Sequence, residues 1–187
     1  MYQKYHTEAL VLGNRERGEN DRVFTLYTEE FGLVRARASA VRTEASRMRY
    51  ALQNYSRARV ALVRGKRGWR IGGAIPARNA GGSAATFARV ARLVARLVAG
   101  EERNQYLFAV LAEAHAALMN EERGAPATIE LVCVARVLHA LGYLSAEALG
   151  GALFTHTAYA GEHLLEAETM RDKLLLSINK AIAETHL

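Results

Sequence analysis

The sequence predicts an α+β protein in which a small five-stranded β-barrel is followed by an all-helical domain. Apolar residues recur with the two-residue period of strands up to position 76, and with a helical period from position 84 onward. The charge divides in the same region, because residues 1–80 carry 16 Lys and Arg against 7 Asp and Glu, whereas residues 81–187 carry 9 against 12. The net charge of +6 therefore hides a basic half and a slightly acidic half.

Five short runs rich in β-branched and aromatic residues predict the strands. The first run is followed by a turn expected at Gly13-Asn14, and Gly65-Lys66-Arg67-Gly68 predicts a hairpin turn between the last two runs. Five strands with tight turns favour a barrel that closes its own edges, and the five-stranded form is the OB-fold. The runs are Thr7–Leu12, Arg22–Thr28, Leu33–Val41, Arg57–Arg64 and Trp69–Ile75.

Small residues at positions 77–82 indicate the boundary, with Ser83 as the N-cap of the helix that follows. We therefore expect an OB-fold nucleic-acid-binding domain over residues 1–78 and a helical domain over residues 83–187. Apolar spacing predicts helices from 84 to Gly100, Asn104 to Met119, Pro126 to Gly142 and Glu162 to Glu184. The last of these is expected to bury six residues, namely Leu164, Leu165, Leu174, Leu175, Ile178 and Ile182.

Several classes of protein are disfavoured. A single cysteine, Cys133, excludes an internal disulfide and a multi-cysteine zinc site, and its apolar helix face predicts a buried residue. The strictly apolar runs are all too short to cross a bilayer, and the first ten residues lack the apolar stretch of a signal peptide. There is no GxxxxGK[ST] loop and no recognisable metal-ligand pair among the histidines. We expect a cytoplasmic protein with no cofactor, no metal and no catalytic residue.

One acidic group lies in the basic half, formed by Glu16, Glu19 and Asp21. Clustered carboxylates are what a metal-dependent nuclease requires, so this activity is one alternative. Turns also favour Asp and Asn, whose side chains bond to nearby backbone, and we prefer this interpretation.

The basic half predicts a nucleic-acid-binding surface, because Arg pairs bidentately with phosphate oxygens and such contacts release counterions. Single-strand binders add aromatic stacking platforms, for which Tyr27, Tyr50, Tyr55 and Trp69 are candidates, although we favour a core position for Tyr27. The predicted DNA-binding residues are Arg35, Arg37, Arg42, Arg47, Arg49, Arg57, Arg59, Arg64, Lys66, Arg67 and Trp69.

Three stretches resemble the RecO family of bacterial recombination mediators. They are Gly18–Thr28 with Glu30-Phe31-Gly32, then Ala40–Tyr55 with its Ser46-Arg47 and Leu52-Gln53, and Glu130-Leu131 to His139–Leu144. The chain has Asn54-Tyr55 where the family usually has Pro-Phe. Many relatives carry a four-cysteine zinc loop after the last stretch, but Phe154–Thr157 contains no cysteine, so no zinc is expected.

The resemblance implies an N-terminal OB-fold, a helical C-terminal domain and a non-enzymatic role in recombinational repair. It implies binding of single- and double-stranded DNA, annealing of complementary strands and association with the nucleoid. It also implies partnership with RecR and with the C-terminal tail of single-stranded-DNA-binding protein (SSB), which together load RecA onto SSB-coated strands. The alternative, since fold does not fix ligand, is an OB-fold protein that binds RNA or serves translation.

Overall fold

The computed structural model describes residues 3–77, 84–120, 125–149 and 151–185. Two compact units are formed, one by Met1–Ala80 with Ala91–Phe108 and the other by Gly81–Val90 with Ala109–Leu187. Most of the predicted boundary segment and the predicted cap at Ser83 lie outside the described residues, so the division at 78 and 83 stays a prediction.

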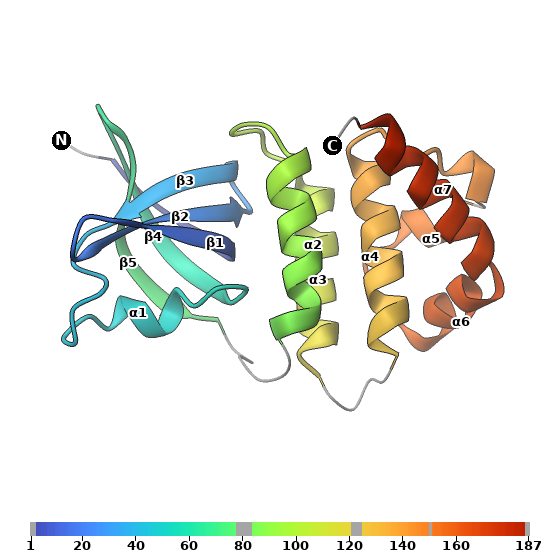
Figure 1. Cartoon of the computed structure of the whole chain (residues 1–187), viewed down its shortest axis with the longest axis horizontal. Coiled ribbons are helices and arrows are strands. Elements are labelled where there is room, and N and C mark those ends of the chain that lie inside the picture. The colour runs from blue at the N-terminus through green and yellow to red at the C-terminus, as the bar shows by residue number, and fades with distance from the viewer. Residues whose placement is uncertain (1–2, 78–83, 121–124, 150, 186–187) are drawn as a thin grey trace. The chain divides into compact units, whose positions relative to one another are not determined.

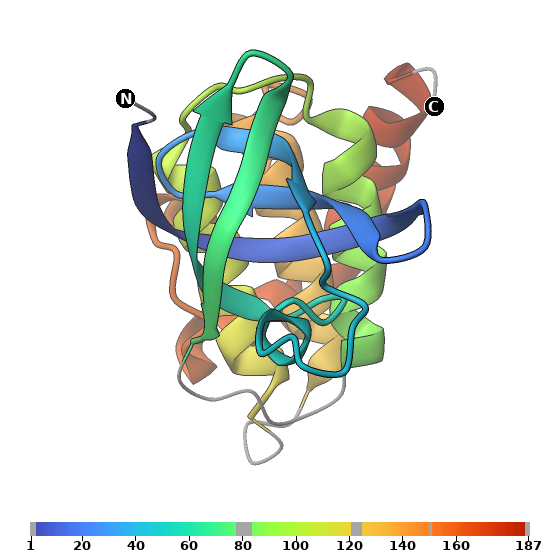
Figure 2. The same ribbon diagram turned by 90° about the vertical axis from the view of Figure 1, so that its left-hand side faces the viewer.

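Five strands form a closed barrel in the order β1-β2-β3-β5-β4, which confirms the predicted OB-fold barrel (Figures 1 and 2). All neighbouring strands are antiparallel except β3 and β5, which run parallel and pair only at Ala36 with Trp69 and Arg37 with Arg70. The strands are β1 (Lys4–Arg17), β2 (Asp21–Thr28), β3 (Gly32–Ala38), β4 (Arg57–Gly65) and β5 (Gly68–Pro76).

The turn predicted at Gly13-Asn14 is wrong, because β1 continues through these residues to Arg17. The register with β2 shifts between Val11 and Gly13, which marks a β-bulge. A bulge bends a strand and increases its twist without ending it. The bend lets one long strand pair with β4 along its first half and with β2 along its second.

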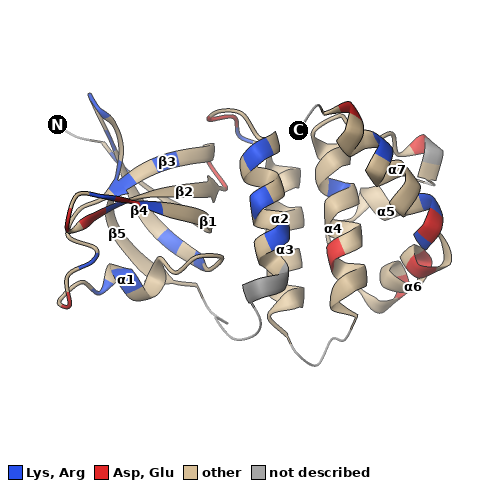
Figure 3. Ribbon diagram, in the orientation of Figure 1, with Lys and Arg blue, Asp and Glu red and all other residues tan. Residues whose placement is uncertain are grey.

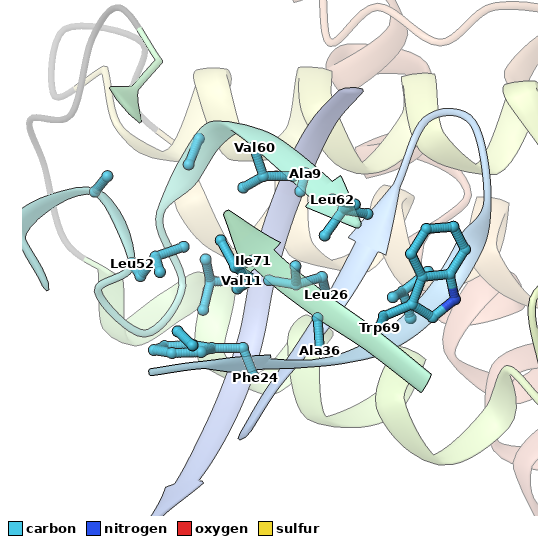
Figure 4. Close-up of a cluster of buried hydrophobic side chains, with 14 of the residues drawn as sticks. Ala9, Val11, Phe24, Leu26, Ala36, Leu52, Val60, Leu62, Trp69 and Ile71 are labelled. Atoms are coloured by element: carbon cyan, nitrogen blue, oxygen red, sulfur yellow. The ribbon is translucent and has the colours of Figure 1, made fainter. Parts of the chain in front are cut away.

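The barrel interior is filled by the inward-facing side chains of all five strands (Figure 4). From Val34 to the end of β3 the alternation is complete, since Val34, Ala36 and Ala38 are buried while Arg35 and Arg37 are exposed. This confirms the two-residue period read from the sequence. The remaining members of this cluster are Ala9, Val11, Phe24, Leu26, Val41, Ala51, Leu52, Ala58, Val60, Leu62, Trp69 and Ile71.

The long connection between β3 and β4 contains a short helix, α1 (Met48–Ala51), which packs against β5. Ala51 and Leu52 are buried in the barrel cluster, so the connection is anchored at this point. Its polar residues Arg47 and Tyr50 remain exposed.

The first unit also includes the segment between helices α2 (Ala84–Leu97) and α3 (Gln105–Leu118). Gly32 has φ +63° at the β2–β3 turn, and a Cβ there would overlap the backbone carbonyl of Glu102. Arg103 pairs with Glu30 at 3.3 Å, and Arg64 pairs with Glu101 at 3.2 Å.

Replacing Gly32 by alanine should lower the free energy of unfolding by about 2–4 kcal/mol, through left-handed strain of about 1–2 kcal/mol and the steric overlap with Glu102. Urea unfolding of the full chain measures the loss. Gly18→Ala is the matched control, because Gly18 has φ +65° with no atom near the added Cβ. Equal losses in the two variants would contradict a close approach at Gly32.

The helices of the second half largely follow the predicted ranges, with one correction. The final helix, expected as one element from Glu162 to Glu184, is two helices that meet at Met170. Helices α2 and α3 each contribute residues to both units. The helical elements that follow them are α4 (Pro126–Ala140), the 3-10 turn η2 (Glu147–Leu149), α5 (Ala152–Thr155), α6 (Gly161–Thr169) and α7 (Arg171–Glu184).

The break changes which leucines are buried. Met170 has φ −110° and ψ 18°, outside the helical region, so the apolar stripe does not continue from α6 into α7. Leu165 is 69% exposed and Leu175 is 39% exposed, contrary to the prediction, while Leu174 and Ile178 are buried as expected.

An arginine lies in the interior of the helical half. Arg136 of α4 is fully buried, and its guanidinium donates to the carbonyl oxygens of Leu153 at 2.9 Å and of Thr157 and Ala158 at 3.0 Å. The group also lies 4.8 Å from the ring centre of Tyr159. The charge is thus held by backbone carbonyls and an aromatic face, and no carboxylate of the described residues pairs with it.

Candidate nucleic-acid interface

A groove of about 790 Å³ lies on the barrel, between the far end of β1, strand β3 and the β4–β5 hairpin. We call it the basic groove, because seven exposed cations line it and no Asp or Glu is among its described lining residues. Its apolar floor includes Val23, Val63 and Ile71. The seven cations are Arg15, Arg17, Arg35, Arg37, Lys66, Arg67 and Arg70.

Local structure explains why these cations converge. Alternation in β3 directs Arg35 and Arg37 away from the core. The glycine-bracketed turn, in which Gly68 has φ +96°, presents Lys66 and Arg67 at the tip of the hairpin. Strands β3 and β5 are neighbours that pair at only two positions, and side chains of both strands line the groove.

Among the groove cations, only Arg37 pairs with a carboxylate of the described chain. Its Nε donates to Asp21 Oδ2 at 2.7 Å, and Asp21 Oδ1 accepts the N–H of Ala40 at 2.9 Å. The Ala40 hydrogen bond, followed by the Arg37 bond, holds the pKa of Asp21 below its ordinary value. The other six cations have no ion-pair partner among the described residues, so their charge is available to an anion.

Two of the three carboxylates suggested for a nuclease, Asp21 and Glu16, are engaged in other contacts. Asp21 anchors the turn at Ala40, which is the turn chemistry expected for it. Glu16 pairs with Arg42 at 3.3 Å and lies 3.6 Å from Arg22. Within the described residues, no three His, Cys, Asp or Glu side chains are arranged to hold a metal ion.

The structure separates the predicted DNA-binding residues into groups. Arg35, Arg37, Lys66, Arg67 and Trp69 line the basic groove. The others lie elsewhere on the barrel. Arg47 precedes α1 and Arg49 lies within it, Arg42 contacts Glu16, Arg64 contacts Glu101, and Arg57 and Arg59 contact Glu8.

The predicted DNA-binding residues do not include three groove residues, namely Arg15, Arg17 and Arg70. Because a turn was expected at Gly13-Asn14, the first two were not assigned to a strand, although their two-residue spacing is that of one strand face. Arg70 alternates with the buried Trp69 and Ile71, so the same periodicity within the fifth run was sufficient to identify it.

The role predicted for Trp69 needs correction. Its side chain is 5% exposed and belongs to the barrel cluster, as Figure 4 shows at one end of that cluster. The indole packs against Tyr5 and Phe31 at ring-centre distances of 5.7 and 5.0 Å, and the Arg64 guanidinium lies 5.0 Å from its centre. Because these groups surround the ring, we no longer expect it to stack on a base.

The tyrosines differ in exposure. Tyr27 is buried, which confirms its expected core position, and burial raises the pKa of its hydroxyl. Tyr50 is 62% exposed, and Arg49 lies 4.7 Å from its ring centre while donating to its hydroxyl at 2.6 Å. Tyr55 is half-buried with φ +66°. Tyr50 is therefore the tyrosine whose ring is best placed to meet a base.

A second groove, of about 860 Å³, lies on the outer face of β1, β4 and β5. Its charges are mixed, since Arg57 donates to Glu8 at 2.9 Å and Arg59 lies 3.5 Å from the same carboxylate. Lys4 and Glu29 add one charge of each sign. This partial neutralisation leaves the second groove with less positive charge than the basic groove.

Cys133 is buried as predicted, and burial raises the pKa of its thiol to about 12. The thiol is therefore uncharged at neutral pH and a poor nucleophile. No helix in the described ranges has the combined length and apolar character needed to cross a membrane.

Comparison with known proteins gives a consistent result for the barrel. A family model described as "Recombination protein O N terminal" matches residues 1–70. Proteins named "DNA repair protein RecO" are similar over about the same region. The one from Desulfitobacterium hafniense (strain Y51) is 44% identical over 62 residues, that from Pelotomaculum thermopropionicum 42% over 62, and that from Myxococcus xanthus 39% over 61. Each alignment covers 33% of this chain, and 23%, 24% and 25% of the respective relative, so the matched region spans about a quarter of these relatives' length.

Proposed function

We propose that the protein is a DNA-binding mediator of recombinational repair, because residues 1–70 match the family model described as "Recombination protein O N terminal". It binds single-stranded DNA in the basic groove and anneals complementary strands. The observation that carries this proposal is the convergence of seven exposed cations in a groove whose described lining contains no acidic residue.

The charge of the groove accounts for both activities. Each arginine can hold phosphate oxygens in a bidentate fork, and every phosphate contact releases condensed counterions. Affinity gained in this way carries no sequence preference, as annealing of arbitrary strands requires. Two strands bound to a cationic surface also repel each other less, so base pairing can begin.

The family resemblance supports a wider role. In this role the protein acts with RecR, contacts the C-terminal tail of SSB and assists loading of RecA onto SSB-coated strands. The binding is non-enzymatic, so labelled DNA incubated with magnesium or manganese should stay intact. Cleavage that Asp21→Ala abolishes would instead establish the nuclease alternative.

The direct test is annealing of complementary strands that are coated with SSB, with and without the tail of SSB. We expect annealing on intact SSB and its loss when the tail is removed. Annealing that is indifferent to the tail, together with tighter binding to RNA than to DNA, would favour the alternative of an RNA-binding OB-fold protein.

Tyr50→Ala should weaken binding of single-stranded DNA by the loss of one stacked base, about 1–3 kcal/mol or ~5- to 150-fold. Tyr50→Phe is the matched control, because it keeps the ring and removes only the hydroxyl that Arg49 contacts. Fluorescence anisotropy with a single-stranded and a duplex oligonucleotide measures both variants. The duplex should bind all three proteins alike, since its bases are already stacked. An alanine variant that binds single strands like the parent protein would rule out this platform.

A further inference from the structure

Over the side chains that the structure describes, helix α2 presents an exposed face that carries only arginine. From Phe87 to Leu97 the exposed residues are Arg89, Arg92 and Arg96. Their spacing of three and four residues places them side by side along one face of the helix. Figure 3 shows blue and no red along α2, because the helix contains no acidic residue.

These arginines differ in their partners. Arg89 pairs with Glu130 of α4, and this hydrogen-bonded carboxylate raises the pKa of Arg89. Arg92 and Arg96 make no ion pair or hydrogen bond with any residue in the described part of the chain. Two uncompensated cations thus stand one helical turn apart, about 6 Å between their Cβ atoms.

A general abundance of arginine does not explain this arrangement. On α6 and α7 the exposed charges are of both signs, with Arg171 pairing with Glu168 at 2.9 Å and Asp172 next to Lys173. Like charges four residues apart destabilise an isolated helix, whereas opposite charges stabilise it. Arg96 lies in the last turn, where the helix dipole favours a cation, but Arg92 does not, and the charge of both unpaired arginines is available to an external anion.

We propose that Arg92 and Arg96 form a second phosphate-binding surface, which holds the backbone of a DNA strand and shares no residue with the basic groove. Two guanidinium forks at this spacing can hold neighbouring phosphates of one strand. This inference rests on the proposed function, and it supplies a second place for backbone charge in a protein that pairs two strands.

The chemistry of the face favours nucleic acid over a protein partner. Protein interfaces bury an apolar centre, often with aromatic anchors. None of the exposed large hydrophobic residues in the described chain lies on α2. Charge without exposed apolar surface is what a phosphate backbone requires, because its contacts are electrostatic.

The test uses the full chain with Arg92→Gln and Arg96→Gln combined. The slope of log K against log salt for a long single-stranded oligonucleotide should fall by about 1.4, since each single-strand phosphate contact contributes about 0.7. Lys173→Gln combined with Lys180→Gln is the matched control, because it removes two exposed cations of α7 and should leave the slope unchanged. The Arg92→Lys and Arg96→Lys pair should retain the slope, which shows that charge at these positions is responsible.

Circular dichroism of each variant confirms that the helices are intact before binding is compared. An unchanged slope in the glutamine variant overturns the inference, and if groove variants still weaken binding, the proposed function stands without it. A lowered slope in the α2 variant with no effect of the groove variants supports this surface and refutes the groove. Loss of binding to a polyglutamate peptide with an unchanged DNA slope overturns the phosphate assignment and indicates an acidic protein partner.

Discussion

Combined replacement of Arg35, Arg67 and Arg70 by alanine should strongly weaken DNA binding, with the same effect on every sequence. These three cations come from β3, the hairpin and β5, and none has an ion-pair partner among the described residues. The slope of log K against log salt for a single strand should fall by about two units, because each lost contact contributes about 0.7. Titrations between about 50 and 200 mM salt measure this fall.

The matched control for the groove is Arg59→Ala. Arg59 is an exposed barrel arginine, but it lies beside Glu8 on the outer face of β4. The Arg59→Ala substitution should change the slope by much less than the value of about 0.7 expected for one lost phosphate contact. If the triple variant binds as tightly as the parent protein across this salt range, the basic groove is not the DNA site. If Arg59→Ala weakens binding as much as one groove substitution, the second groove takes part as well.

Arg37→Ala is expected to have a smaller effect than any of the three groove residues chosen above. Its guanidinium is already shared with Asp21, so a phosphate must compete with a carboxylate that is held in place by Ala40. Single-residue slopes measured under the same conditions provide the comparison. A slope change at Arg37 larger than at Arg35 would show that the Asp21 contact opens when DNA binds.

Arg136→Ala should lower the free energy of unfolding by about 3–5 kcal/mol, the largest stability effect we expect, because it removes buried hydrogen bonds and leaves a cavity. The substitution removes the donor to three carbonyl oxygens, those of Leu153, Thr157 and Ala158, and leaves a cavity beside Tyr159. Urea unfolding measures the loss. Arg136→Lys should recover only part of the stability, because one ammonium group cannot replace the planar fork.

The control for Arg136 is Arg171→Ala, which removes an exposed arginine paired with Glu168 and should change stability by less than about 1 kcal/mol. Hydrogen exchange adds a local readout, since residues 153–159 should lose protection in the lysine variant even where the protein remains folded. A loss of less than about 1 kcal/mol in Arg136→Ala, or unchanged protection in Arg136→Lys, would contradict the role of this arginine.

Much of the barrel was predictable because the signals for strands, such as two-residue alternation, lie in neighbouring residues. The alternation of Arg35 and Arg37 with Val34 and Ala36 indicated both the strand and its exposed face, and the structure agrees. The continuation of β1 past Gly13 was not predictable from local signals. A glycine beside asparagine is typical of a turn, and only pairing with β2 converts it into a bulge.

In the helical half, too, local signals predicted only part of the structure. Spacing of apolar residues correctly predicted buried Leu174 and Ile178, but a period continued across Met170 wrongly placed Leu165 and Leu175 inside. Trp69 was misjudged for a related reason. Its basic neighbours suggested a nucleic-acid contact, whereas Tyr5 and Phe31, distant in sequence, pack against its ring.

A basic barrel followed by a helical half, with the arginines of the strands facing solvent, could be predicted from the sequence. These properties follow from composition and periodicity, which act over a few neighbouring residues. Only the fold shows which arginines lie in one groove. It brought Arg15, Arg17 and Arg70 to the groove and matched Arg57 and Arg59 with Glu8, because strand pairing and barrel closure determine which distant side chains meet.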